Sequence, residues 1–588
     1  MSPDPSSAPA GRRATWLAAI GLAALLGGIL FFRLGDDLPM RSHEALLAET
    51  ARNMVLDRPV TLADGSRPNP WLIPNFDDLP RLRKTPLPYW TVASLAYLTG
   101  HVDEWTARLP SAAAALGTAL IMMALLRRRY DRPTAFLGGA ILATTEMFLQ
   151  TARMALSDMP MTFFTTASLA ALWMAVETLG RRRFAWLVLA GAAAGLAMMA
   201  KGPVPAVIFF APYAVAAVIM VVRLVRDRRE GRPVGREWAW AIGGVIVAKL
   251  VFFLIVAPWP LYVWYHVPQA VEIWKVESVD RSTGEFGHRE APYFYLLRLP
   301  FFVAPWTVFF FYGVALAVAR LRREAAERPW LLFVGAWLLG PLAAFSIAAG
   351  KQDHYLLPII PACAVFMVLA LRHLLTATDS PTQHAARRLL VGHAVAVFVI
   401  GVAAAAVGLG LLAAPSLITT TKIPPAFVRP EVTGAVAVMG GLLIAGGLVA
   451  WVLARRQKLA GSLIALLAVF AAAYLWAWPM LHGPLDRSNT AADFGRQVAQ
   501  RIPPDARLCS YMDSNNTVIY YAGRPMMPLP GLPYLETEMA RGQTFYLMCS
   551  DRYRPQLKDV PGLVPLIHEE DPGGSGDGFW LFRYAGEP

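Results

Sequence analysis

The stretch RSHEALLAETARNMVL, residues 41–56, decides how the rest of the chain is interpreted. Its apolar residues recur at helical spacing and form one stripe, whereas Glu49, Arg52 and Asn53 lie off that stripe. This spacing predicts an amphipathic helix that follows the first membrane-spanning segment without crossing the membrane itself. We expect the helix to lie along the membrane surface.

The first turn of this helix carries two ionisable side chains. Ser42 is a favourable N-cap residue, which places His43 and Glu44 in the first turn. Free backbone N–H groups and the positive end of the helix dipole favour an ionised carboxylate there. Taken alone, the pair is either a solvated helix start or an acid held at the membrane face for chemistry.

The composition identifies a membrane protein. The chain has 588 residues, of which 56% are hydrophobic and 16% charged, and its mean hydropathy is +0.43. These values exclude a water-soluble globular protein. The net charge of +13 does not indicate a nucleic-acid partner, because the basic residues occur in short clusters between apolar segments.

Thirteen apolar runs are long enough to cross a hydrocarbon core of about 30 Å. They lie near residues 14–32, 108–126, 133–151, 159–179, 184–200, 203–223, 238–262, 297–319, 329–349, 355–374, 389–414, 432–454 and 460–481. The first run is long for a cleaved signal and no small-residue cleavage site follows it, so we interpret it as an uncleaved anchor.

The basic clusters fix the expected topology. With a cytoplasmic N-terminus, the thirteen runs place all the arginine-rich clusters on the cytoplasmic side. Counting residues 86–100 as a further crossing would invert them, so we predict a re-entrant or surface helix, or part of a bent span, at these positions. The C-terminus is then extracytoplasmic.

The chain divides into a transmembrane domain, residues 1–481, and a small α/β domain, residues 482–588. In the first domain, long outer loops cover residues 33–107 and 263–296. In the second, residues 491–501 suggest a helix, and ARLCSYM, TVIYYAG, TFYLMCS and GFWLFRYA suggest strands. Cys509 and Cys549 form either a disulfide or two buried thiols. Zinc spacing is absent from the sequence, and we predict no metal site.

Basic residues precede a proline-broken segment in the first outer loop. Arg83 and Lys84 lead into residues 85–90, TPLPYW, which include Tyr89. The segment is either an ordinary headgroup anchor or a clamp for a lipid-borne phosphate.

Two more outer turns carry charged residues at span ends. Arg153 and Asp158 lie in the stretch RMALSDMP, where Asp158 caps a helix or contributes to a site. For Lys201, in the turn KGP, snorkelling to the interface is the favoured explanation.

The fourth group lies near the outer end of a later span. Lys351, His354 and Tyr355 share the stretch KQDHYLLP, and for Lys351 snorkelling and a site role are equally supported. In the outer loop 263–296, Glu277 and His288 belong either to a solvated face or to a site, and residues 271–279 suggest a second surface helix.

Together, the ordered motifs HEALLAETARNM, RKTPLPYW, ARMALSDMPMTFF, KGP and K…HYLLP resemble the aminoarabinose transferase and protein O-mannosyltransferase families of GT-C fold glycosyltransferases. The resemblance covers residues 12–374. It implies a mainly α-helical membrane bundle with juxtamembrane amphipathic helices and a small extracytoplasmic α/β domain. It also implies a bacterial inner-membrane enzyme that moves a sugar from a polyprenyl-phosphate carrier to lipid A, another glycan or protein.

The resemblance assigns roles to individual residues. Lys84 matches a lysine near the carrier phosphate, Asp158 matches the aspartate of a DMP motif, and Lys351 and Tyr355 match a K…YLLP stretch. We expect Arg83 and Lys201 to assist at the phosphate. Secondary candidates for substrate binding are His354, Tyr89, Arg153, Glu277 and His288.

One departure from the family bears on catalysis. The family's first outer helix usually begins with an Asp-Glu pair, which reads His43-Glu44 here. Either Glu44 takes over as the base, His43 is the base, or Asp158 carries more of the work; we favour Glu44 assisted by His43. The acidic neighbour of the family's lysine is also replaced, by Arg83, which suggests a different sugar or acceptor.

The expected reaction is a single displacement that inverts the anomeric carbon. Glu44 or Asp158 would act as general base, and fixed cations such as Lys84 and Lys351 would stabilise the departing phosphate. The sequence has no glycine-rich nucleotide-sugar motif, and we predict no cofactor, with metal dependence left open. The alternatives are a lipid-linked sugar transporter or flippase and a membrane scaffold; a convergence of these side chains favours the enzyme.

Overall fold

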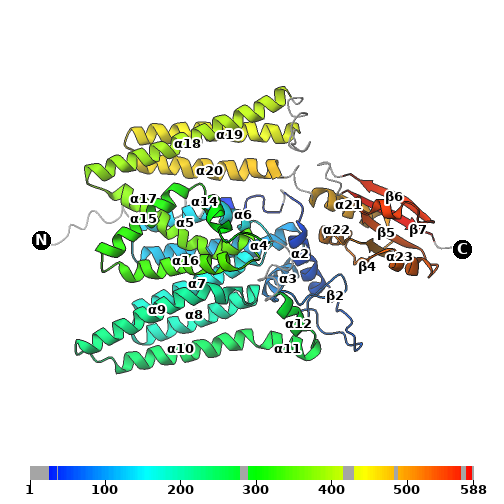
Figure 1. The fold of residues 1–588 in the computed structure, drawn as a ribbon, viewed down its shortest axis with the longest axis horizontal. Helices are drawn as coiled ribbons and strands as arrows, with labels where there is room; N and C mark the ends of the chain where they lie inside the picture. The colour runs from blue at the N-terminus through cyan, green and yellow to red at the C-terminus, as the bar shows by residue number, and fades with distance from the viewer. Residues whose placement is uncertain are drawn as a thin grey trace.

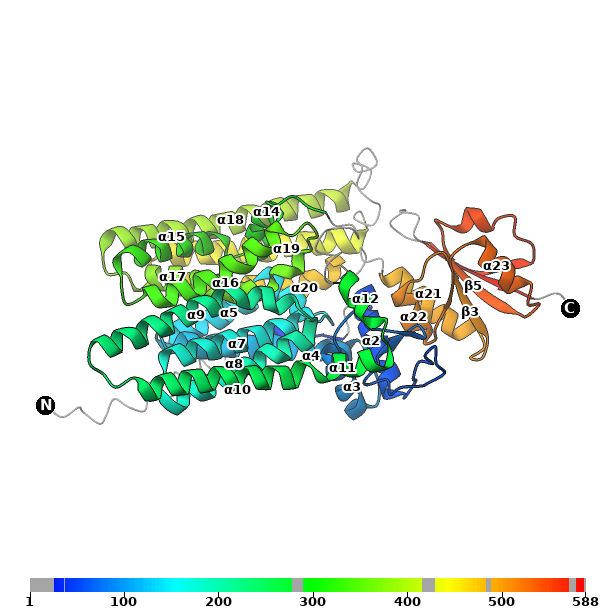
Figure 2. The same ribbon diagram turned by 60° about the horizontal axis from the view of Figure 1, so that its bottom comes forward.

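The computed structural model describes residues 26–35, 38–277, 289–414, 429–482, 488–570 and 578–585. These residues form a bundle of long helices with a small sheet domain at one end (Figure 1). Helices predominate, so the predicted fold class is confirmed. The sheet domain is reached after the last long helix, α20, and the bundle end next to it also carries helices α2, α3, α11 and α12 (Figure 2).

Ten helical segments in the described part of the chain are long and apolar enough to cross a membrane. They are α4 (Glu104–Arg127), α7 (Asp158–Glu177), α8 (Gly180–Lys201), α9 (Val204–Arg229), α10 (Gly235–Val256) continuing into α11 (Pro258–His266), α16 (Arg328–Ile347), η3 (Asp353–Ile359) continuing into α17 (Ile360–Thr376), α18 (Ser380–Ala413), α19 (Pro430–Arg455) and α20 (Leu459–His482). Each matches one of the predicted runs.

Two of the predicted spans are broken helices. Residues 297–319 fall on α14 (Phe294–Phe302) and α15 (Thr307–Arg323), which bend by 113° at a break that contains Pro305. Residues 133–151 fall on α5 (Arg132–Ala143) and α6 (Glu146–Ala152). Between the latter two, the hydroxyls of Thr144 and Thr145 donate to backbone carbonyls four residues earlier. Of the first predicted span, residues 14–25 lie outside the described residues.

Residues 86–100 do not form a crossing. They contain α3 (Leu87–Thr99), whose 13 residues are too short to span a bilayer. The helix ends at Gly100, which has a φ of 85°, a conformation that glycine adopts easily. Helix α3 packs against α2 (Ser42–Val55), as expected for a short helix held at one end of the bundle.

Two predictions about helix α2 are wrong. Its N-cap residue is Arg41 rather than Ser42, and the Glu44 carboxylate accepts a hydrogen bond from the Arg41 backbone N–H at 3.2 Å. The polar face is also buried, since Glu49 and Asn53 are only 3% and 7% exposed. Helix α22 (Asn516–Ala522) packs against α2, and Arg52 of α2 donates to the carbonyl oxygen of Tyr520 in α22 at 2.9 Å.

The C-terminal domain contains a five-stranded sheet with strand order β4-β3-β5-β7-β6. Its elements are α21 (Ser488–Arg501), β3 (Arg507–Tyr511), α22, β4 (Met527–Leu529), α23 (Leu532–Met539), β5 (Phe545–Ser550), η6 (Arg554–Leu557), β6 (Leu563–Glu569) and β7 (Phe579–Tyr584). Strand β3 runs parallel to β4 and β5, whereas β7 runs antiparallel to β5 and β6.

The predicted strand TVIYYAG is wrong, because these residues form α22. Asn515 caps the helix by accepting hydrogen bonds from the backbone N–H groups of Thr517 and Val518, and Gly523 ends it in the left-handed conformation. The other three predicted strands correspond to β3, β5 and β7.

The cysteines do not form a disulfide. Cys509 on β3 and Cys549 on β5 are both free and buried, and so is Cys363 in α17. Cys509 and Cys549 both contribute to one apolar cluster of the sheet domain. The buried-thiol alternative is therefore the correct one.

Candidate functional site

A buried ion pair joins two neighbouring helices at the bundle end next to the C-terminal domain. Asp158 is the first residue of α7, Lys201 is the last residue of α8, and the Lys201 ammonium donates to the Asp158 carboxylate. Their exposed fractions are 4% and 9%. Either charge alone would be costly to bury, so each stabilises the other. The snorkelling explanation for Lys201 is wrong.

The segment η3 brings aromatic and imidazole groups to this pair. The Lys201 ammonium lies 5.2 Å from the centroid of the Tyr355 ring, a cation–π arrangement. The neighbouring His354 interacts electrostatically with Asp158 and Lys201. The segment is held in place just before these residues, because the Tyr295 hydroxyl donates to the carbonyl oxygen of Gln352 at 3.0 Å.

The loop around Lys84 reaches the same place. The backbone N–H of Gly202, next to Lys201, donates to the Thr85 hydroxyl at 3.2 Å. Lys84 also contributes to the electrostatic interactions of Asp158. The loop is anchored by Trp274 of α12 (Ala270–Lys275), whose indole N–H donates to the carbonyl oxygen of Leu82 at 2.9 Å.

The first turn of α2 completes the group. His43 is exposed and acts electrostatically on His354, as Lys84 does. We call this group the polar cluster, and its members are His43, Lys84, Asp158, Lys201, His354 and Tyr355. Five separate parts of the chain therefore place predicted site residues together.

The polar cluster holds two ammonium groups in fixed positions, each paired with one carboxylate. Two ammonium groups face one carboxylate within it, and two imidazoles lie beside them. The Lys84 ammonium is also 2.5 Å from the Glu277 carboxylate, which moderates its charge while holding the side chain in position. In a poorly hydrated site, fixed ammonium groups stabilise developing negative charge strongly.

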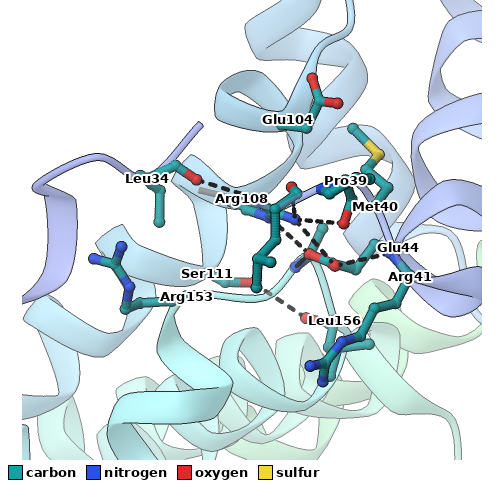
Figure 3. Close-up of polar contacts among 12 residues, drawn as sticks. Leu34, Pro39, Met40, Arg41, Glu44, Glu104, Arg108, Ser111, Arg153 and Leu156 are labelled. Atoms are coloured by element: carbon teal, nitrogen blue, oxygen red, sulfur yellow. Dashed lines mark hydrogen bonds and ion pairs between the residues drawn. The ribbon is translucent and has the colours of Figure 1, made fainter. Parts of the chain in front are cut away.

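Glu44 is not part of the polar cluster, because its carboxylate is bound by Arg108 and by two backbone N–H groups. One of its oxygens accepts from Arg108 Nε at 2.9 Å and from the Ala155 N–H at 2.8 Å. The other accepts from Arg108 Nη2 at 3.3 Å and from the Arg41 N–H (Figure 3). Burial alone would raise the pKa of Glu44, but the Arg108 charge and these hydrogen bonds together lower it. Both oxygens are engaged, so the geometry contradicts our choice of Glu44 as the base.

Three other predicted site residues do not belong to the polar cluster. The Lys351 ammonium donates to the carbonyl oxygens of Glu290, at 3.2 Å, and Ala348, which lies at the end of α16. Tyr89 is buried in the apolar contact between α3 and α2. Arg83 is exposed.

Two predicted residues lie elsewhere. Arg153 follows α6 and donates to the carbonyl oxygen of Ile29 at 3.1 Å. His288 lies outside the described residues. Within the described ranges, no three His, Cys, Asp or Glu side chains gather in a way that would hold a metal ion.

Sequence reasoning missed Arg108 and Thr85. Arg108 sits at the start of a predicted span, where a charged residue should have been treated as a functional or structural candidate. Thr85 lies beside Lys84, and its contact with Gly202 connects two motifs that are far apart in the chain. No local spacing reveals such a contact.

The chain is similar in sequence to known proteins. Residues 68–276 match the family model of dolichyl-phosphate-mannose-protein mannosyltransferases. Over 379 residues the chain is 27% identical to the undecaprenyl phosphate-alpha-4-amino-4-deoxy-L-arabinose arabinosyl transferase of Pseudomonas paraeruginosa, a match that spans 63% of this chain and 62% of that protein. A protein of the same name from Pseudomonas aeruginosa strain UCBPP-PA14 is 27% identical over 85% of this chain and 80% of its own length.

Solved structures show the same architecture. The crystal structure of ArnT from Cupriavidus metallidurans bound to undecaprenyl phosphate superposes with a TM-score of 0.74 at 21% identity. The superposition covers 97% of this chain and 99% of that one. At this identity the likeness establishes the fold, including both the helical bundle and the C-terminal domain.

Proposed function

We propose that this GT-C fold membrane protein, which is similar to aminoarabinose transferases and protein O-mannosyltransferases, moves a sugar from a polyprenyl-phosphate carrier to an acceptor. The observation that carries the proposal is the polar cluster, in which Lys84, Asp158 and Lys201 meet from distant parts of the chain. The arabinosyl transferase relatives and the solved structure with undecaprenyl phosphate support the same class of donor. A membrane scaffold would have no need for this arrangement.

Lys84 and Lys201 are the proposed phosphate-binding groups. During transfer, the bond between the anomeric carbon and the carrier phosphate oxygen breaks, and the phosphate leaves with the electron pair. Its growing charge is stabilised by ammonium groups that are already held in place, Lys84 by Glu277 and Lys201 by Asp158. The acceptor oxygen attacks from the opposite side, so the configuration at the anomeric carbon inverts.

His43 is the proposed proton acceptor for an acceptor hydroxyl. Both candidate carboxylates are engaged by cations, Glu44 by Arg108 and Asp158 by Lys201. The His43 imidazole is exposed at the edge of the polar cluster, where an incoming hydroxyl can reach it. In its neutral form an imidazole accepts a proton near neutral pH. Asp158 then positions Lys201, and Glu44 positions the first turn of α2.

The location follows from the topology argument. We propose a bacterial inner membrane protein with a cytoplasmic N-terminus, and with the polar cluster and the C-terminal domain on the periplasmic side. The acceptor is lipid A, another glycan or a protein. The basic clusters at helix ends such as those of α9 and α15, which lie at the bundle end away from the C-terminal domain, support this orientation (Figure 1).

A transfer assay tests the proposal. Purified protein in lipid nanodiscs would be incubated with undecaprenyl phosphate carrying radiolabelled 4-amino-4-deoxyarabinose or mannose, together with bacterial envelope lipids and proteins. We expect the label to leave the carrier and appear on one acceptor fraction, and Lys84→Ala to reduce that transfer. Carrier that crosses a vesicle bilayer with its sugar intact would instead identify a flippase and overturn the transferase proposal.

A further inference from the structure

A lysine lies in the middle of a membrane-spanning segment and faces away from the bundle. Lys249 belongs to α10, which forms one spanning segment, Gly235–His266, together with α11. At about 1.5 Å per residue, Lys249 lies about 21 Å from the start of this segment and about 26 Å from its end. The hydrocarbon core of a bilayer is about 30 Å thick, so Lys249 lies near its centre.

The Lys249 side chain is exposed on the bundle surface. Among the residues that the structure describes, none forms a hydrogen bond or an ion pair with it. Helical side chains point toward the helix N-terminus, so an extended lysine of about 6 Å would still leave its ammonium about 15 Å from Gly235. The apolar residues begin near Trp238, so that ammonium stays within the core. A charge at this depth is costly, and such residues are usually paired.

The rest of the protein packs against a different face of α10. Gly191 of α8 lies against Ala248, and Gly195 of α8 lies against Ile255. In α10 itself, only Ala241 and Gly244 are buried. Helix α10 lies at the edge of the bundle, beside α8 (Figure 1). No other described helix therefore covers the face that carries Lys249.

The exposed face of α10 has the residue spacing of a helix–helix contact. Ile242, Ile246, Lys249 and Phe253 follow one another at intervals of four, three and four residues, which places them on one stripe. The three apolar members are 54%, 54% and 59% exposed, in the order given. Lys249 lies within this stripe, at a position that faces the partner in a two-helix contact. A single polar residue at such a position selects which helix binds.

A second copy of this chain does not supply the missing carboxylate. In the ten spanning segments, every Asp and Glu lies within three residues of a segment end. Glu146, at the start of α6, is half-buried and acts electrostatically on Asp353 and Tyr474. A twofold dimer through the α10 stripe would also bring two Lys249 side chains together. The charge therefore calls for a different protein.

We propose that this face of α10 binds a transmembrane helix of a different membrane protein, and that this helix carries an aspartate or glutamate at the depth of Lys249. The pair would remove two lone charges from the hydrocarbon core, while Ile242, Ile246 and Phe253 pack beside it. Helix α10 contributes no residue to the polar cluster, so the inference is independent of the proposed transfer reaction.

A designed transmembrane helix tests whether Lys249 selects a carboxylate. The full-length protein, carrying a donor fluorophore, would be placed in phosphatidylcholine vesicles with an acceptor-labelled leucine-alanine helix that has one central glutamate. We expect this helix to bind about tenfold more tightly than the same helix with a central glutamine. Lys249→Met should remove the difference and should fold, since its side chain is exposed to lipid. Arg236→Gln, at an exposed residue in the first turn of α10, is the matched control and should preserve it.

Photo-crosslinking in the native membrane identifies the occupant. With a photoreactive phenylalanine in place of Ile246, we expect an adduct whose linked peptide is a transmembrane helix of another protein that contains Asp or Glu. Lys249→Met should reduce its yield about tenfold.

Four results would overturn the proposal. Equal binding of the glutamate and glutamine helices would show that Lys249 reaches lipid headgroups instead. An adduct between two copies of this chain would identify a homodimer, and adducts with lipid alone would identify a free surface. A linked partner helix without Asp or Glu would remove the role of charge. Failure of the transferase function would appear separately, as absent sugar transfer with these binding results unchanged.

Discussion

Asp158, the first residue of α7, and Lys201, the last residue of α8, form a buried ion pair against the ring of Tyr355. The antiparallel packing of α7 and α8 makes the pair possible, because it brings the start of one helix to the end of the other. Asp158 and Lys201 are 43 residues apart in the sequence, and two short motifs that are each ambiguous alone thereby become one site. The pair also holds a cation where a carrier phosphate would bind.

Asp158→Asn should abolish most transfer and also destabilise the protein. Removing one partner of a buried ion pair leaves an uncompensated charge and costs about 3–5 kcal/mol. The loss of a positioned electrostatic group should reduce the transfer rate by at least about 100-fold. Thermal unfolding in detergent and the initial rate of transfer measure the two effects.

The double variant Asp158→Asn/Lys201→Met separates those effects. Removing both charges should restore much of the lost stability, because neither partner is then left alone. Transfer should stay low, since the cation that faces the phosphate is gone. A double variant with wild-type transfer would mean that the pair has only a structural role.

His43→Ala should reduce transfer by about 10²- to 10⁴-fold with little change in unfolding temperature, because His43 is exposed and serves as the proposed base. His43→Asp should retain more activity than His43→Ala, since a carboxylate also accepts a proton from the same position. Equal activities for the two variants would argue against proton transfer at residue 43.

Lys84→Ala should weaken use of the lipid donor about 10- to 100-fold, the effect of losing one charged hydrogen bond to phosphate. The effect should fall on the KM for the carrier, with a smaller effect on the KM for the acceptor. Arg83→Ala is the matched control, because Arg83 is adjacent but exposed. The assignment of Lys84 fails if the two alanine variants have the same donor KM.

Glu44→Gln should lower stability at neutral pH by about 3–5 kcal/mol, because it leaves Arg108 buried without its carboxylate. The sign of the pH dependence follows from the lowered pKa of Glu44. Its contribution is present above its ordinary pKa of 4.5 and is lost as pH falls through the lower folded value. The difference in unfolding temperature between wild type and variant should therefore shrink below pH 4.5. A difference that stayed constant with pH would refute this role.

Tyr521→Phe should loosen the C-terminal domain from the segment before α2 and from the start of α4. The Tyr521 hydroxyl accepts a hydrogen bond from the Met40 N–H at 2.9 Å and donates to the Glu104 carboxylate. Losing both partly buried contacts should cost about 1–3 kcal/mol and speed proteolysis between the domains. Tyr534→Phe, at a side chain that is 58% exposed, is the control. If both variants are cut at the wild-type rate, this contact does not hold the domain.

Apolar periodicity and the charge of the loops were enough to predict the bundle, because both report directly on the membrane. They also predicted that residues 86–100 form no crossing. The structure agrees with this prediction, because α3 has only 13 residues. The strand TVIYYAG was mistaken for a β-strand because its β-branched and aromatic residues favour strands locally. Packing against α21 and α2 makes it a helix instead.

The candidate site was predictable only in part. Motif order identified Lys84, Asp158 and Tyr355, whose neighbours in the structure come from other motifs. The role of Glu44 was not predictable, because its partner Arg108 lies 64 residues away in the sequence. No residue in the first turn of α2 indicates this ion pair. The burial of Glu49 was hidden for a similar reason, since α22, which packs against α2, lies at the far end of the chain.

The most direct test of the central claim is an experimental structure of the protein with undecaprenyl phosphate bound. We expect the carrier phosphate to lie within hydrogen-bonding distance of both the Lys84 and Lys201 ammonium groups, beside Tyr355. A phosphate seated instead against Arg41 and Arg153, with the polar cluster unchanged, would contradict it.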